Sequence, residues 1–258
     1  GATWNNVVAT LPPPLNDALQ TYVLGMHYYD GVIYATMFLN GVGGYCAKWD
    51  EGTDTWSSLG AVAVGAVSSC GSPFAVSHTE VYFPNSSNKL YRWNGAVLAL
   101  DSTLPKAAGE GSPTAVVYDG VNVYYLTQYG WAPPWVRVYR GSFESWTLDN
   151  EFSNQSENFV SGRHLHVDSG GNLWLILSGT GLPSNSKIYK RDFATGVWSI
   201  SLDLGVTSNV YALWCYNDQI VCSRSGIVYV SNNGGTSWSN YDVFADWGWT
   251  GGEYYGLA

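Results

Sequence analysis

The chain has 258 residues, a net charge of −9 and only 11 lysine and arginine residues, so neither nucleic acid nor an anionic membrane surface is an expected partner. No apolar run is long enough to cross a bilayer, and we expect no membrane insertion. Aromatic residues make up 16% of the chain, charged residues make up 12%, and 30 glycines are present, a balance that favours strands and tight turns.

The first predicted element is a strand in "TWNNVVATL", and the stiff connector "LPPPLND" follows it. Five units come next, and each opens on an apolar strand that ends in a turn. These first strands lie in "YVLGMHYYDG" from Tyr22, "FAVSHTE" from Phe74, "TAVVYDG" from Thr114, "RHLHVDSGG" from Arg163 and "NVYALWCYND" from Asn209. A second apolar strand follows each of them, and acidic residues in these first turns are expected to close hairpins.

A second kind of turn separates the third and fourth strands of the units. The pattern D-x-x-T-x-x-W occurs as Asp50, Thr53 and Trp56, and again as Asp192, Thr195 and Trp198. A later turn, "SNNGGTSW", contains Ser231, Asn233, Gly235, Ser237 and Trp238. Asp or Asn bonds to backbone amides in such turns, Gly supplies a positive φ, and Trp covers the turn with apolar area.

The repeated order of four strands in roughly 40 to 50 residues predicts the blades of a β-propeller. We expect an all-β fold with five full four-stranded antiparallel blades in a single domain covering residues 1–258. The units cover about residues 21–60, 72–104, 112–150, 162–205 and 208–245. Residues 1–20 and 246–258 are closing segments. A sparse sixth blade built from both termini, or a fragment of a longer chain, are the alternatives.

The turns carry a resemblance to known families. The D-x-x-T-x-x-W turns resemble those of kelch-like propellers. "SNNGGTSW" resembles the Asp-box turn Ser-x-Asp-x-Gly-x-Thr-Trp, with Asn233 for Asp and Ser237 for Thr. Asp-boxes occur in sialidases, other glycosidases, sortilin-like receptors and lectins, so the resemblance implies a propeller and opens a glycosidase hypothesis.

The sequence offers little support for catalysis. Sialidases resemble one another in using three arginines around a carboxylate, but Arg92, Arg140 and Arg191 fall beside predicted blade turns. No spacing pairs two carboxylates for glycoside hydrolysis. His164 and His166 share one face of a strand, but the four histidines do not form a ring of ligands. We expect no cofactor and no metal.

Two aromatic clusters are the candidate ligand-binding residues. "TQYGWAPPW" contains Tyr129, Trp131 and Trp135, and "FADWGWTGGEYY" contains Trp247 and Trp249. Such residues stack against sugar rings or anchor a protein partner, and the alternative is that they cover the blades.

These observations favour a non-catalytic binding module that binds glycans in the manner of a lectin, or mediates surface adhesion, through its aromatic loops. We expect it at an extracellular or virion or cell surface. The first alternative is a structural or attachment component of a virion, phage tail or other large assembly, with a protein partner. The second is an Asp-box glycosidase. Cys215 and Cys222 flank a hairpin turn, and the register decides whether they face each other; buried thiols are the simpler interpretation.

Overall fold

The structure is a computed structural model. It describes residues 21–39, 43–62, 72–85, 88–104, 115–129, 135–142, 145–152, 159–179, 186–205, 212–224 and 227–242. These residues form strands and turns, and among them no helix is long and apolar enough to span a membrane.

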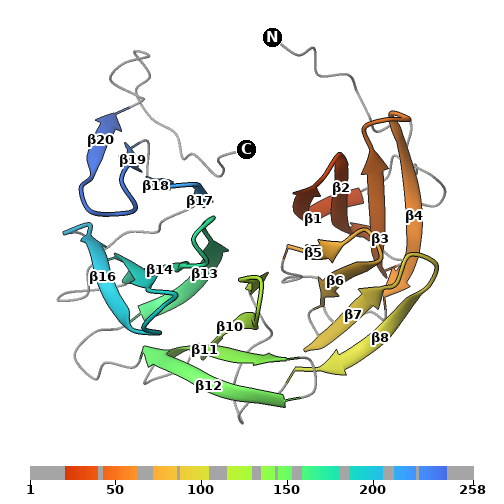
Figure 1. Ribbon diagram of the computed structural model, residues 1–258, viewed down its shortest axis with the longest axis horizontal. Coiled ribbons are helices and arrows are strands. Elements are labelled where there is room, and N and C mark those ends of the chain that lie inside the picture. The colour runs from red at the N-terminus through yellow and green to blue at the C-terminus, as the bar shows by residue number, and fades with distance from the viewer. Residues whose placement is uncertain are drawn as a thin grey trace. The chain divides into compact units, whose positions relative to one another are not determined.

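The chain divides into two compact units, Gly1–Pro105 and Lys106–Ala258. The first unit contains two four-stranded antiparallel sheets, β1–β4 and β5–β8, each with its strands in chain order (Figure 1). Their bounds are β1 Thr21–Tyr29, β2 Val32–Leu39, β3 Gly43–Asp50, β4 Thr55–Val62, β5 Phe74–Ser77, β6 Glu80–Pro84, β7 Lys89–Trp93 and β8 Leu98–Thr103.

The second unit contains three sheets of the same design, β9–β12, β13–β16 and β17–β20. Their bounds are β9 Ala115–Tyr118, β10 Val123–Tyr129, β11 Trp135–Ser142, β12 Ser145–Phe152, β13 Phe159–Val167, β14 Leu173–Gly179, β15 Lys187–Arg191, β16 Trp198–Asp203, β17 Ala212–Tyr216, β18 Gln219–Arg224, β19 Ile227–Ser231 and β20 Ser239–Asp242.

The observed strands follow the five predicted units in number and order. The boundaries differ by a few residues, because β12 extends to Phe152 and β13 begins at Phe159. The predicted closing segments, 1–20 and 246–258, lie outside the described residues. The sixth blade and the single domain therefore stay predictions.

Hydrophobic clusters join neighbouring sheets within each unit. In the first unit, Tyr34 and Cys46 of one sheet share a cluster with Val81 and Phe83 of the next. In the second unit, one cluster joins β9–β12 to β13–β16, and another joins β13–β16 to β17–β20. Both faces of the middle sheet are therefore buried, which explains the continuous apolar run of β14.

The outermost strand of four sheets carries one extra residue, at the point where its register against the third strand shifts. The extra residue is Leu59 in β4, Asp101 in β8, Asp149 in β12 and Ser201 in β16. Each lies three positions after a shared strand position that holds, in chain order, Trp56, Leu98, Trp146 and Trp198. A β-bulge of this kind redirects one side chain.

In the second unit, the bulge residue of β12, Asp149, contacts the next sheet, β13–β16. Asp149 accepts hydrogen bonds from Arg191 Nε at 3.0 Å and Arg191 Nη2 at 3.1 Å. The same carboxylate accepts the indole N–H of Trp198 at 2.8 Å. The Asp149 and Arg191 side chains are only 6% and 4% exposed. This is a buried, bidentate ion pair that joins β9–β12 to β13–β16.

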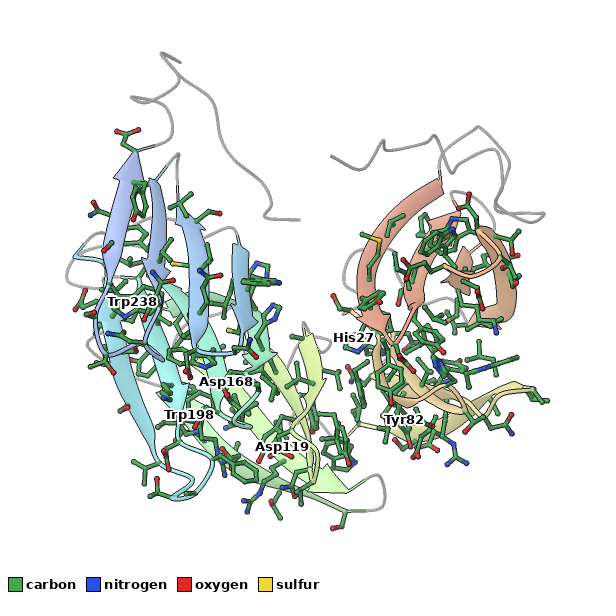
Figure 2. The ribbon with its side chains drawn as sticks, turned by 45° about the horizontal axis from the view of Figure 1, so that its top comes forward. His27, Tyr82, Asp119, Asp168, Trp198 and Trp238 are labelled. Carbon is green, nitrogen blue, oxygen red and sulfur yellow. The ribbon has the colours of Figure 1, made fainter. Side chains whose placement is uncertain are left out.

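Ser201 has the equivalent role in the next sheet along the chain. Its hydroxyl donates to the Gly235 carbonyl at 3.0 Å and accepts the indole N–H of Trp238 at 3.3 Å (Trp198 and Trp238 are labelled in Figure 2). In the first unit the pair is apolar instead. Leu59 is buried in the cluster against which Leu98 packs. In the second unit, the polar bulge residues Asp149 and Ser201 thus each accept a hydrogen bond from a Trp of the next sheet, whereas Leu59 in the first unit packs near Leu98.

Candidate binding site

The turns of the D-x-x-T-x-x-W pattern are held by their own side chains. Asp192 Oδ1 accepts hydrogen bonds from both the backbone N–H and the hydroxyl of Thr195, each at 2.8 Å. These bonds lower the pKa of Asp192, because they stabilise the ionised carboxylate. Asp50 Oδ1 accepts the amides of Gly52 at 2.9 Å and Thr53 at 3.2 Å. The acidic residue of each turn is therefore occupied with turn formation.

In the turn "SNNGGTSW", the two residues that differ from the Asp-box, Asn233 and Ser237, bond to each other. Asn233 Oδ1 accepts the backbone N–H of Ser237 at 2.9 Å, as a carboxylate would. Asn233 Nδ2 then donates to the Ser237 hydroxyl at 2.8 Å, which a carboxylate could not do. Ser231 Oγ accepts the Gly235 N–H at 2.9 Å. The turn is complete without a ligand, and we assign it a structural role.

The acids of the first turns are also engaged with their own backbone (Asp119 and Asp168 are labelled in Figure 2). Asp119 Oδ1 accepts the amides of Val121 at 2.8 Å and Asn122 at 2.7 Å. Asp168 accepts the amide of Gly170 at 2.9 Å and, through Oδ2, the indole N–H of Trp174 at 2.9 Å. These carboxylates have the contacts of turn-forming residues and not those of an acid–base pair.

Among the arginines that the sialidase hypothesis would need, Arg191 is buried against Asp149. Arg140 Nε also lies 3.7 Å from this carboxylate. Arg92 lies beside its own bulge residue, with Arg92 Nε 3.4 Å from Asp101 Oδ1. Within the described ranges, no group of three His, Cys, Asp or Glu residues has the geometry to hold a metal ion.

One polar cluster of the first unit was not apparent from the sequence. The hydroxyl of Tyr34 lies 3.1 Å from His78 Nδ1, and His78 Nε2 lies 3.5 Å from Asp30 Oδ2. The ring of Tyr29 meets His78 edge-on, with centroids 5.3 Å apart. Burial raises the pKa of Tyr34, and Tyr29 and Asp50 raise it further. The raised pKa keeps the Tyr34 hydroxyl protonated, and the tautomer of His78 decides which of the two groups donates in their hydrogen bond.

The predicted ligand-binding residues fall mostly outside the described residues. Trp131, Trp247 and Trp249 lie outside them, and the side chains of Tyr129 and Trp135 are not described. The backbone, however, places Tyr129 at the end of β10 and Trp135 at the start of β11, directly opposite each other. Residues 130–134 thus connect two paired strands at the end of a hairpin.

Cys215 and Cys222 are not bonded to each other. The register pairs Cys215 with Ile220 and Cys222 with Leu213, so the two cysteines are not cross-strand partners. Burial raises the pKa of Cys215, and it raises the pKa of Cys222 to about 12. Both are free thiols; the prediction of buried thiols holds for Cys222, whereas Cys215 is half-buried.

We expect both thiols to resist alkylation by iodoacetamide in the folded protein at about pH 8, because only the thiolate reacts and burial suppresses it. After denaturation both should react fully. Peptide mapping by mass spectrometry measures each site, and rapid native labelling of Cys222 would contradict the buried placement.

Comparisons with known proteins identify a similar fold but no family. No protein-family model matches the chain, and no curated protein matches it. Among solved structures, one titled "YCF48 bound to D1 peptide" is similar with a TM-score of 0.56. Its sequence identity is 13%, and the match covers 87% of this chain and 68% of that chain. The fold is a β-propeller. Its blades are the four-stranded sheets described above, and the likeness extends to the fold alone.

Proposed function

We propose that this propeller is a non-catalytic binding module that recognises a glycan through aromatic side chains at the end of the β10–β11 hairpin. The observation that carries the proposal is the direct pairing of Tyr129 with Trp135. This pairing fixes both ends of the segment Gly130-Trp131-Ala132-Pro133-Pro134. A short loop held at both ends in this way would lose little conformational entropy when its aromatic residue binds a ligand.

The chemistry of a glycan fits such a loop. The apolar face of a sugar ring stacks on an aromatic side chain, while its hydroxyls bond to polar groups nearby. Prolines restrict the backbone and reduce the freedom that binding would remove. The turn carboxylates already have backbone partners, which supports binding in preference to hydrolysis. An extracellular or virion or cell-surface location belongs to the same proposal.

A polypeptide segment is the second candidate ligand. The similar propeller structure is described by its title as bound to a peptide. The net charge of −9 would favour a positively charged segment over an acidic one. If the protein is an attachment component of a larger assembly, it would bind such a polypeptide segment of a partner protein.

Screening of the purified chain on a glycan array tests the proposal. We expect selective binding that Trp131→Ala weakens at least about tenfold, because an aromatic anchor contributes about 2 kcal/mol or more. Trp214→Ala is the matched control, since it removes a tryptophan that is 39% exposed on β17, in a different sheet from this hairpin. If the chain binds no glycan but does bind basic peptides, a polypeptide segment is the ligand and the glycan proposal is rejected. Equal binding by both variants would reject the hairpin as the site.

A further inference from the structure

The sheet β17–β20 has two different faces. One face packs against β13–β16 through Leu213, Ile220 and Cys222. The strand register places Val221, Val230, Val228 and Tyr241 together on the opposite face. The three valines are half-buried and Tyr241 is 53% exposed. Among the described residues, no hydrophobic cluster includes any of these four.

This apolar face lacks the polar residues through which the preceding sheet, β13–β16, binds the turn of β17–β20. In β15, Lys190 follows Tyr189 and donates to the Gly234 carbonyl of the next sheet at 3.2 Å. The corresponding residue of β19, after Tyr229, is Val230. The fourth strand differs too. The register of β19 against β20 has no shift, so β20 offers no bulge residue like Ser201 of β16.

A buried polar group lies on the same face. Ser223 is 1% exposed, and its hydroxyl has no hydrogen-bond partner among the described residues. Burying a hydroxyl without a hydrogen-bond partner is unfavourable, so such groups are normally paired. The face thus combines apolar side chains with one buried hydroxyl that requires a hydrogen-bond partner. Such a surface is suited to an apolar segment and not to a charged one.

We infer that residues 243–258 of this chain cover the Val221–Val230 face. The segment continues directly from Asp242 at the end of β20 and so begins at the edge of this sheet. It is rich in the residues that would cover an apolar sheet: Phe244, Trp247, Trp249, Tyr254, Tyr255 and Leu257. Its glycines allow close approach to the strands. Trp247 and Trp249 then serve the fold, the second of the two roles that the sequence left open for them.

Photo-crosslinking in the full chain tests the inference without any ligand. A benzoylphenylalanine in place of Trp214, which the register pairs with Val221 on the same face, should crosslink to a peptide within 243–258, identified by mass spectrometry. The same substitution at Leu148, which is 49% exposed on β12, is the control and should give no crosslink to this segment. A crosslink from position 214 only to another region of the chain or to a second copy would overturn the inference, as would no crosslink.

Hydroxyl-radical labelling provides a second measurement. Oxidation of Tyr241 should be low in the full chain and should rise several-fold in a chain that ends at Asp242. Equal labelling of Tyr241 in the two chains would overturn the inference. If the shortened chain does not fold, the crosslink in the full chain decides the matter.

Discussion

Asp149→Ala is expected to lower the free energy of unfolding by about 3–5 kcal/mol, because it leaves the buried Arg191 guanidinium without its partner. The indole N–H of Trp198 loses its acceptor in the same variant. Urea denaturation followed by circular dichroism measures the loss.

Glu151→Ala is the matched control for this variant. Glu151 lies on the same strand and pairs with Arg137 Nε at 2.6 Å, but both side chains are far more exposed, at 32% and 21%. Partly solvated pairs contribute about 0–1 kcal/mol. If the two variants lose the same stability, Asp149 does not join the two sheets as described. Replacing Asp149, Arg191 and Trp198 together by apolar residues should recover much of the loss, because Leu59 and Leu98 form an apolar contact of this kind.

Gly235→Ala is expected to lower the free energy of unfolding by about 2–5 kcal/mol, from about 1–2 for the left-handed backbone and about 1–3 for overpacking. Gly235 has a φ of +81°, and a Cβ there would press on the ring of Trp174 and on Ser201 Oγ. The turn and the preceding sheet would have to separate. Denaturation by urea again measures the loss.

Gly120→Ala separates the two contributions. Gly120 has a φ of +97°, yet a Cβ there would meet nothing within 4 Å. This control should lose only the backbone contribution, about 1–2 kcal/mol. Equal losses at positions 120 and 235 would mean that the turn does not press against Trp174.

The blades were predictable because their signals are local. Asp192 and Thr195 are three residues apart and bond to each other, so the turn is readable from four adjacent residues. Hydrophobic alternation and turn chemistry then fix the order of the strands. The carboxylates of Asp119 and Asp168 were likewise expected to close first turns, and their hydrogen bonds show how they do so.

The contacts between sheets were not predictable in this way. Asp149 and Trp198 are 49 residues apart, and Asp149 points toward the next sheet only because the strand register shifts there. The sequence does contain a signal for the bulge residue. It lies three positions after the tryptophan or leucine near the start of the fourth strand. The His78 contact with Tyr34 spans 44 residues and joins two different sheets of the first unit, which no local pattern encodes. For the proposed ligand site, the sequence supplied the aromatic residues, and the structure added the pairing of Tyr129 with Trp135.

The most direct test of the proposed function is a calorimetric titration of the glycan selected on the array. We predict that Trp131→Ala weakens its binding at least about tenfold and that Trp131→Phe retains most of the affinity, because the aromatic face is kept. Wild-type affinity in a folded Trp131→Ala variant would contradict the β10–β11 hairpin as the glycan site.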